Sequence, residues 1–423
     1  MKVVIVNMND GGGGAAIAAM RLMHALRKQN IEAQVLVLKK STQDPYVISM
    51  GNHKWTQWKA YIYFLLEHLL IFLNNGFSKS DLFRVSLSYL GFDISKHPCI
   101  VEADIIHLHW VNKSFLSYSA IQKLVNLGKP VVWTMHDMWV ATAMCHHARD
   151  CEKFKTTCDH CFYLHAKDWM SLTSRTYQSK KNIFAAHIPQ LVCCSEWLQK
   201  RIAGSSILDT HNALVIPNPI NIEIYAKKNK RISQAAFKLD PTQFYILFCA
   251  AKVTDDRKGL NYLIEALQIL KQKYPHYFAN MQVVVVGTAN NELQTLFPCQ
   301  IRTPGFISDE QMMVTLYNAV DVFVTPSLDE NLPNTIMEAM ACGTPCIGFA
   351  TGGIPEMITH KETGYIAKYQ SAEDLANGIV WIFEHAEKCN LSQKSICKVQ
   401  HLYTEQIVAN QYVALYEQMQ MQD

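Results

Sequence analysis

Short apolar runs alternate with helical segments along the chain. In the first half, runs rich in Val, Ile and Leu predict strands at residues 3–7, 33–38, 104–110, 130–135, 190–194 and 213–217, with helices at 15–28, 114–127 and 168–187. The second half repeats the alternation, with strands at 245–251, 282–286 and 321–325 and helices at 260–273, 333–341 and 404–421. Apolar strands separated by helices are typical of parallel sheets covered on both faces. The pattern predicts an α/β protein.

Chain length indicates more than one domain. A chain of 423 residues exceeds one ordinary hydrophobic core and suits two. A turn rich in proline and asparagine, residues 217–221 (PNPIN), falls near the middle. We therefore expect a first domain at 1–219 and a second beginning at residue 220, each a doubly wound, Rossmann-like sheet.

Composition excludes several classes of protein. A hydrophobic content of 49% with 18% charged residues excludes a disordered chain. Residues 1–219 contain 23 Lys and Arg against 15 Asp and Glu, although the whole chain carries a net charge of only +3. A basic first domain favours an anionic partner or a membrane surface. Nucleic acid is disfavoured as a partner, because the sequence contains no dense basic run with interleaved aromatic residues.

The state of the cysteines depends on the compartment. The chain begins with a predicted strand instead of a signal peptide, so we expect a cytoplasmic protein. Thirteen cysteines there would be reduced thiols or metal ligands. Four of them lie close together in a segment with little predicted regular structure: Cys145, Cys151, Cys158 and Cys161. Four thiolates could form a closed structural zinc site, in which His160 could replace one sulfur. The alternative is four ordinary thiols.

Four glycines, Gly11 to Gly14, separate the first strand from the first helix. Glycine lets the backbone approach a ligand closely, and the start of a helix favours a phosphate. The run also fits the G-x-G-x-x-A motif of nicotinamide dinucleotide sites. Those sites place an acidic residue after the second strand, where this chain has Lys39 and Lys40, so a nicotinamide cofactor is disfavoured.

Two carboxylates and two glycine turns are concentrated in residues 326–356. Glu330 follows the strand at 321–325, and Glu338 lies within the helix at 333–341. The free N–H groups near Asn331 and Leu332 would face a ligand above the strand and favour a phosphate, while each carboxylate could accept hydrogen bonds from sugar hydroxyls. The alternative is a capped surface helix with two solvated carboxylates.

Glu330 and Glu338 are followed by AMACGTPCIGF and GGIPE. This arrangement resembles the signature of the family 4 retaining glycosyltransferases, which have the GT-B fold of two doubly wound Rossmann-like domains facing across a cleft. The resemblance implies that Glu330 contacts the donor sugar and Glu338 the ribose of the nucleotide. One departure from the family is visible: Asn331 and Leu332 stand where the family often has glycine and phenylalanine. The backbone of that position can keep its role despite the change of side chains.

The same resemblance covers most of the chain and suggests roles for other residues. It implies that Lys258 neutralises the donor diphosphate together with a second cation, a family arginine whose place is taken here by Lys252, so that Arg257 could compensate. Gly13 and Gly14 would face the donor phosphates and the acceptor. His136, in the sequence TMHD, would lie near the reacting centre, and residues 401–423 would form a helix that crosses back from a second domain at 220–400.

The stretch at 55–73 (WTQWKAYIYFLLEHLLIFL) is unusually apolar and aromatic. Lys59, Glu67 and His68 interrupt it, and it is too short to span a bilayer. It fits either a helix buried against the first domain or one lying in a membrane interface with Trp55 and Trp58 at the headgroups.

We therefore expect a retaining, metal-independent hexosyltransferase that uses a nucleotide diphosphate sugar. The expected acceptor is a saccharide on a polyprenyl diphosphate, in cell-surface polysaccharide assembly at the inner face of the cytoplasmic membrane. No cofactor is expected in catalysis. The alternatives are a catalytically silent relative that binds sugar nucleotide or glycan as a scaffold, and a GT-B-shaped epimerase or phosphorylase.

Overall fold

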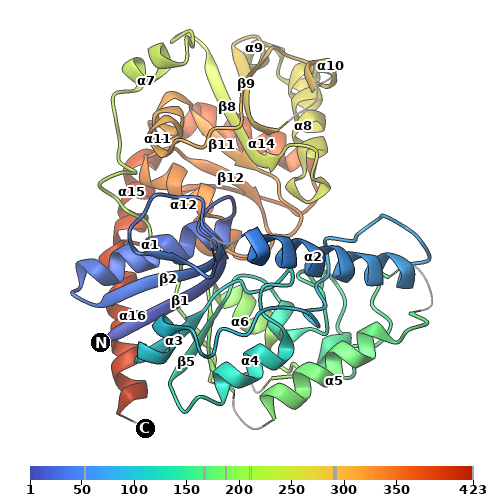
Figure 1. The fold of residues 1–423 in the computed structure, drawn as a ribbon. Coiled ribbons are helices and arrows are strands. Elements are labelled where there is room, and N and C mark those ends of the chain that lie inside the picture. The colour runs from blue at the N-terminus through green and yellow to red at the C-terminus, as the bar shows by residue number, and fades with distance from the viewer. Residues whose placement is uncertain are drawn as a thin grey trace. The chain divides into compact units, whose positions relative to one another are not determined.

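A computed structural model describes residues 1–51, 54–164, 168–185, 188–208, 210, 212–288 and 293–421. The chain divides into two units (Figure 1). Unit 1 comprises Met1–Pro219 together with Val408–Asp423, and unit 2 comprises Ile220–Ile407. Each unit contains one sheet, of seven strands in unit 1 and six in unit 2.

The strands of unit 1 are parallel wherever they pair, in the order β3-β2-β1-β4-β5-β6-β7. Their bounds are β1 Lys2–Asn9, β2 Glu32–Lys39, β3 Val47–Ser49, β4 Ile105–Leu108, β5 Val131–Met135, β6 Gln190–Cys193 and β7 Leu214–Val215. The helices of this unit are α1 Gly14–Lys28, α2 Lys54–Asn74, α3 Pro98–Glu102, α4 Tyr118–Val125, α5 Leu172–Phe184, α6 Glu196–Ile202 and most of α16 Glu405–Gln420. Short 3-10 turns lie at η1 Trp139–Ala141 and η2 Lys153–Lys155.

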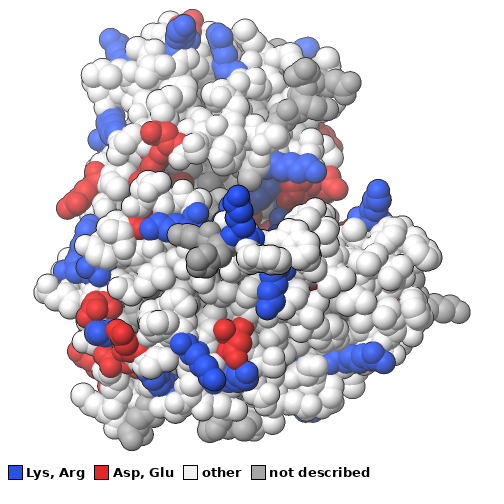
Figure 2. Space-filling model, viewed as in Figure 1, with Lys and Arg blue, Asp and Glu red and all other residues white. Residues whose placement is uncertain are grey.

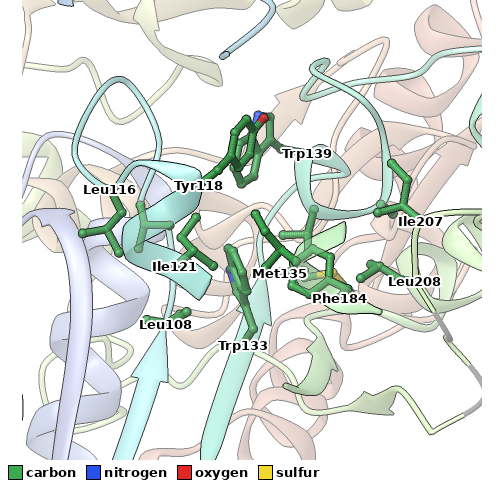
Figure 3. Packing of buried hydrophobic residues seen from close by; sticks show 14 of the residues in the cluster. Leu108, Leu116, Tyr118, Ile121, Trp133, Met135, Trp139, Phe184, Ile207 and Leu208 are labelled. Atoms are coloured by element: carbon green, nitrogen blue, oxygen red, sulfur yellow. The ribbon is translucent and has the colours of Figure 1, made fainter. Parts of the chain in front are cut away.

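One face of the unit 1 sheet is covered by α4, α5 and the segment around η1. Figure 3 shows Leu108 of β4 and Trp133 and Met135 of β5 packed among side chains of those elements, including Ile121 of α4. Trp133 is almost completely buried. Burial of such aromatic and aliphatic side chains, each about 1.5–3 kcal/mol, is the main stabilisation available to the unit.

The other face of this sheet is covered by α1 and by the last helix, α16. Tyr412 and Tyr416 of α16 are buried in one cluster with Val3 and Ile5 of β1. Their hydroxyls reach polar groups inside the sheet, Tyr416 at 2.7 Å from His107 Nδ1 and Tyr412 at 2.8 Å from Thr134 Oγ1. The last residues of the chain therefore complete the core of the first unit.

Unit 2 repeats the architecture with strand order β10-β9-β8-β11-β12-β13, again parallel wherever strands pair. Its strands are β8 Phe244–Lys252, β9 Met281–Thr288, β10 Ile301–Gly305, β11 Val322–Thr325, β12 Cys346–Phe349 and β13 Gly364–Ala367. Its helical elements are α7 Lys230–Ala236, η3 Asp256–Lys258, α8 Leu260–Lys273, α9 Pro275–Phe278, α10 Leu293–Leu296, α11 Glu310–Ala319, α12 Asn334–Ala341, α13 Ile354–Met357, α14 Ala372–His385 and α15 Leu391–Leu402.

Two predicted helices begin later than expected, each for a local reason. The helix predicted from residue 114 begins at Tyr118, because Lys113 and Ser114 adopt left-handed backbone (φ 50° and 63°) and Ser117 caps the helix by accepting the N–H of Ala120. The helix predicted at 168–187 begins at Leu172. There the carboxylate of Asp168 accepts the backbone N–H groups at the start of the helix, and the predicted end at 186–187 lies outside the described residues.

Candidate functional site

The strand order of unit 2 reverses between β8 and β11, and the predicted site residues lie beyond the carboxyl ends of these two strands. Open α/β sheets bind ligands at such a point. Lys258 follows β8 on η3, and Glu330 follows β11. Their side chains form an ion pair with 2.6 Å between Lys258 Nζ and Glu330 Oε2. The lysine side chain is 28% exposed and the glutamate side chain 21%. The structure thus joins two residues that the sequence suggested separately.

Backbone contacts fix the two loops that carry this pair. Leu328 donates its N–H to the carbonyl of Arg257 at 2.7 Å. Gly259 ends η3 with φ 69°, and a Cβ there would lie 1.9 Å from the carbonyl oxygen of Pro326. Only glycine lets these loops approach so closely.

A third loop, which follows β12, contacts the backbone of the loop that carries Glu330. Gly353 donates to the carbonyl of Asn331 at 2.8 Å. Gly352 has φ 58°, and a Cβ at this position would lie 1.5 Å from the carbonyl oxygen of Glu330. The GG pair in the sequence therefore holds the backbone of the carboxylate loop.

The other predicted cations of unit 2 are placed differently from Lys258. Arg257 points its guanidinium at Asp255, with 2.8 Å between Nη2 and Oδ2. Burial lowers the pKa of Arg257, but Asp255 together with the nearby carboxylates of Glu330 and Asp329 outweighs burial and raises it. Lys252 lies exposed at the end of β8, where the pairing with β9 shifts register. Arg257 thus already has an anionic partner in its own loop.

Glu338 lies inside unit 2. It is on α12, which Pro333 precedes as N-cap, and its Oε2 accepts the hydroxyl of Tyr317 at 2.9 Å. Burial, with Glu338 adding to it, raises the pKa of Tyr317 well above its ordinary value. Leu332 is also buried, and nearly all of α12 is covered. The interpretation of a surface helix with two solvated carboxylates is wrong.

In unit 1 the strand order reverses between β1 and β4, and the glycine loop follows β1. Gly13 is the N-cap of α1 without a side-chain cap, both Gly13 and Gly14 are exposed, and a Cβ at Gly13 would meet no atom within 4 Å. The preceding Asp10 accepts four hydrogen bonds from Ser41 and Thr42. Together they outweigh burial and lower the pKa of Asp10.

His136 follows β5 and lies between two buried partners. Its Nε2 is 2.9 Å from His109 Nδ1, and its Nδ1 is 3.5 Å from Cys194 Sγ. Cys194 in turn donates to Asn218 Oδ1 at 3.3 Å. Burial lowers the pKa of His136 to about 4, so the imidazole is neutral at pH 7.

The next residue, Asp137, belongs to a separate polar cluster. Its Oδ2 is 2.7 Å from His146 Nδ1 and accepts the indole N–H of Trp110 at 3.0 Å. Its Oδ1 accepts the N–H of Trp139 at 2.8 Å. These contacts fix the backbone immediately after His136.

The four cysteines of the predicted zinc site lie in the segment between β5 and α5. The neighbouring Cys161 and burial raise the pKa of the Cys145 thiol well above its ordinary value, and Cys158 accepts the N–H of Ala143 at 3.3 Å. Within the described residues, no three His, Cys, Asp or Glu side chains are arranged to hold a metal ion. The present arrangement of Cys145, Cys151, Cys158 and Cys161 does not support zinc, which stays a prediction for metal analysis.

Sequence reasoning missed three residues that hold predicted ones in place: Asp255, Tyr317 and Cys194. Asp255 could have been found, because it stands two residues before Arg257 and caps η3. Tyr317 and Cys194 contact their partners across 21 and 58 residues of sequence, so no local pattern indicates them.

Comparison with known proteins agrees with this architecture. The family model described as Glycosyltransferase Family 4 matches residues 12–224, and Glycosyl transferases group 1 matches residues 243–385. Amylovoran biosynthesis glycosyltransferase AmsK of Erwinia amylovora is 33% identical over 142 residues, which are 31% of this chain and 34% of AmsK. The N,N'-diacetylbacillosaminyl-diphospho-undecaprenol alpha-1,3-N-acetylgalactosaminyltransferase of Campylobacter jejuni is 29% identical over 163 residues, 38% of this chain and 42% of that enzyme.

The matched regions thus span only 34% and 42% of these two curated relatives. Among solved structures, HepE of Anabaena in complex with UDP-glucose aligns with a TM-score of 0.65 at 15% identity, covering 99% of this chain and all of that one. This likeness supports the fold alone. Since the first family model covers about half of the chain and the second most of unit 2, the chain belongs to the family 4, group 1 glycosyltransferases and has the GT-B fold.

Proposed function

We propose that the chain transfers a hexosyl unit from a nucleotide diphosphate sugar to an acceptor hydroxyl, with retention of the anomeric configuration. The observation that carries the proposal is the Lys258–Glu330 pair at the point where strand order reverses in unit 2. Lys258 can meet the negative charge that develops on a departing diphosphate, and Glu330 can accept hydrogen bonds from the sugar.

In the proposed step, the bond between the anomeric carbon and the diphosphate oxygen breaks. A bond from the acceptor oxygen to the same carbon forms on the same face, and the acceptor proton passes to the departing phosphate oxygen. Lys258 and the N–H groups at the start of α12, near Asn331, would offset the negative charge of the leaving group. Lys252 would add a second positive charge from the end of β8. No metal ion is needed in this scheme.

Glu338 and His136 take supporting roles in the proposal. Glu338 would bind the ribose through its carboxylate, which Tyr317 holds in one orientation. His136 would serve as a neutral hydrogen-bonding group beside the transferred sugar, since burial keeps its pKa near 4. Gly13 and Gly14 would leave room for phosphate or acceptor at the start of α1.

For the acceptor, we propose a saccharide carried on a polyprenyl diphosphate, in the assembly of a cell-surface polysaccharide at the inner face of the cytoplasmic membrane. The support comes from relatives. One is named for amylovoran biosynthesis, and another is named for action on a diphospho-undecaprenol-linked saccharide.

A panel of nucleotide sugars tests this function. The full chain is screened for thermal stabilisation, and each stabilising sugar nucleotide is then incubated with a bacterial glycolipid extract. With the sugar of each donor labelled, we expect the labelled sugar of at least one donor to pass into the lipid fraction, with release of nucleoside diphosphate. Nuclear magnetic resonance of the product reports the anomeric configuration. Binding without transfer, in wild type and Glu330→Gln alike, would favour the silent scaffold.

A further inference from the structure

Helix α2 has its sides reversed relative to an ordinary surface helix. Six large apolar side chains on one face are 41–77% exposed: Trp55, Trp58, Tyr61, Leu65, Leu66 and Leu69. The buried positions are Glu67, His68, Ile71 and Asn74, three of which are polar. In a globular protein the apolar stripe of a helix normally faces the core. The exposed face of α2 therefore needs an explanation outside its own unit's core.

The buried polar side chains fix this orientation of the helix. The carboxylate of Glu67 accepts the N–H groups of Leu87 and Ser88 at 3.3 and 3.2 Å and the hydroxyl of Ser114 at 3.0 Å. At the other end, Asn74 donates to Asp168 Oδ1 at 2.8 Å. Rotating α2 to hide its apolar face would break these buried hydrogen bonds, and each polar group left unsatisfied costs about 1–3 kcal/mol.

The exposed apolar face continues beyond the helix. Phe77 and Phe83, in the segment after α2, are 69% and 61% exposed. Trp169, from the segment before α5, is 67% exposed and donates its indole N–H to the carbonyl of Leu73 at 3.3 Å. We call these three residues and the six on the helix the α2 surface. Tryptophans lie at both ends of it, Trp55 and Trp58 at one and Trp169 at the other.

The exposed charges on α2 and beside it are mainly positive. Lys54, Lys59 and Lys79 are exposed, whereas Glu67, the one acidic residue of α2, is 2% exposed. Asp81, in the following segment, is paired with Arg84. In Figure 2, drawn from the same side as Figure 1, the surface over α2 is largely white, and blue side chains lie near it.

We propose that the α2 surface lies in the headgroup region of an anionic bilayer. Exposed Trp and Tyr on an apolar face with lysines beside them fit an interfacial helix, in which aromatic rings sit at headgroup level and ammonium groups meet anionic lipids. None of the helices in the described residues is long and apolar enough to cross a bilayer. The inference draws on the proposed function in one respect: docking would place the enzyme where a lipid-linked acceptor is presented.

Vesicle co-sedimentation tests the docking surface directly. The full chain is mixed at low salt with vesicles of phosphatidylcholine containing phosphatidylglycerol. The triple variant Trp55→Ser, Trp58→Ser, Leu65→Ser should bind at least about tenfold more weakly than wild type, because it removes apolar side chains that docking would bury in the bilayer. Its melting temperature should be unchanged, since these side chains are exposed. Val101→Ser with Leu214→Ser, exposed apolar positions of the same unit, is the matched control and should bind like wild type.

A charge-reversal pair gives a second, independent arm. Lys54→Glu with Lys59→Glu should weaken binding to the anionic vesicles about tenfold or more and leave weak binding to pure phosphatidylcholine little changed. Lys96→Glu with Lys181→Glu, exposed lysines near α3 and on α5, makes the same charge change elsewhere in the unit and should have a smaller effect.

Three results would overturn the inference. The first is wild-type protein that ignores anionic vesicles at low salt. The second is equal loss of binding in the matched controls. The third is concentration-dependent dimerisation that the triple variant abolishes, which would make the surface an interface between two copies. Nucleotide-sugar binding is measured in parallel. If vesicle binding persists while every sugar nucleotide fails, the proposed function is wrong and the docking surface stands.

Discussion

At the scale of single residues, the pair of Lys258 and Glu330 joins the two groups to which the proposed reaction gives opposite tasks. Both side chains are partly exposed, so the pair itself contributes only about 0–1 kcal/mol to stability. In the proposed reaction its importance would be chemical, because each group holds the other in position until a donor competes for it.

Replacing Lys258 by alanine tests that assignment. We expect kcat/KM to fall by two to four orders of magnitude, about 3–5 kcal/mol, because the ammonium would meet charge that develops on the leaving diphosphate. The melting temperature should change little. Lys230→Ala is the matched control, since Lys230 pairs with Asp321 immediately before β11 while Glu330 follows that strand. Near-normal turnover of Lys258→Ala would remove the lysine from the mechanism.

Replacing Glu338 by glutamine tests the proposed ribose contact. We expect KM for the donor to rise more than kcat falls, since the ribose does not change during the reaction. Tyr317→Phe is the control, because it removes the hydrogen bond to Glu338 while leaving the carboxylate in place. Steady-state kinetics separates the two parameters, and a loss confined to kcat would contradict the assignment.

At the scale of elements, the site of unit 2 depends on three loops whose backbones touch. Gly259 and Gly352 both have positive φ, and both stand against a carbonyl of the loop that follows β11. The loop that carries Glu330 is thereby held between η3 and the segment after β12, so side-chain position is decided by neighbouring elements.

Gly352→Ala should displace this loop. The added methyl would lie 1.5 Å from the carbonyl oxygen of Glu330, so the backbone must move. We expect a lower melting temperature and at least about a tenfold loss of kcat/KM. Gly128→Ala is the control, because Gly128 also has positive φ (68°) but has open space around its Cβ position. It should lose stability through backbone strain alone, about 1 kcal/mol. Equal activity in the two variants would show that close approach at Gly352 does not matter.

At the scale of the whole molecule, the sheet of unit 1 contains a row of buried histidines beneath its last helix. His107 lies between Thr134 and Tyr416, each 2.7 Å away, and His109 bonds to His136. Among the described residues, His109 Nε2 has no hydrogen-bond partner. Burial lowers the pKa of His107 to about 3, of His136 to about 4, and of His109 well below its ordinary value.

These shifts predict a pH dependence of stability. Because the folded pKa values lie below the ordinary value near 6.5, the unfolded chain binds more protons between about pH 6.5 and 4. The free energy of unfolding of unit 1 should therefore fall as pH falls through that window, by up to about 1.4 kcal/mol per pH unit for each histidine.

Tryptophan fluorescence during urea unfolding measures this dependence, since seven of the eight tryptophans lie in unit 1 and only Trp381 in unit 2. His109→Gln should flatten the slope, whereas His276→Gln, at an exposed position of unit 2, should not. A slope that is unchanged in His109→Gln would show that this imidazole is not buried in the neutral form.

Local sequence patterns are enough to predict the alternation of elements, both doubly wound sheets and the family. Strands such as β1 and helices such as α8 and α12 follow local apolar patterns, and the predicted helix at 260–273 is confirmed to the residue. The sequence also indicated Glu330 and Glu338, because glycines, prolines and carboxylates at set spacings mark strand ends and helix starts, whereas Lys258 follows from the resemblance to the family. These features depend on neighbours a few residues apart.

Which side chains meet depends on contacts between elements far apart in the sequence. The ion pair of Lys258 and Glu330 depends on how the adjacent strands β8 and β11 bring their loops together, and the contact of Glu338 with Tyr317 depends on how α12 packs beside α11. The orientation of α2 is the clearest case, since its apolar pattern fits both a helix buried against the first domain and one lying in a membrane interface. Hydrogen bonds that Glu67 accepts from the backbone of a loop 20 residues away hold the polar face inside, because an unsatisfied buried carboxylate costs more than exposed apolar surface.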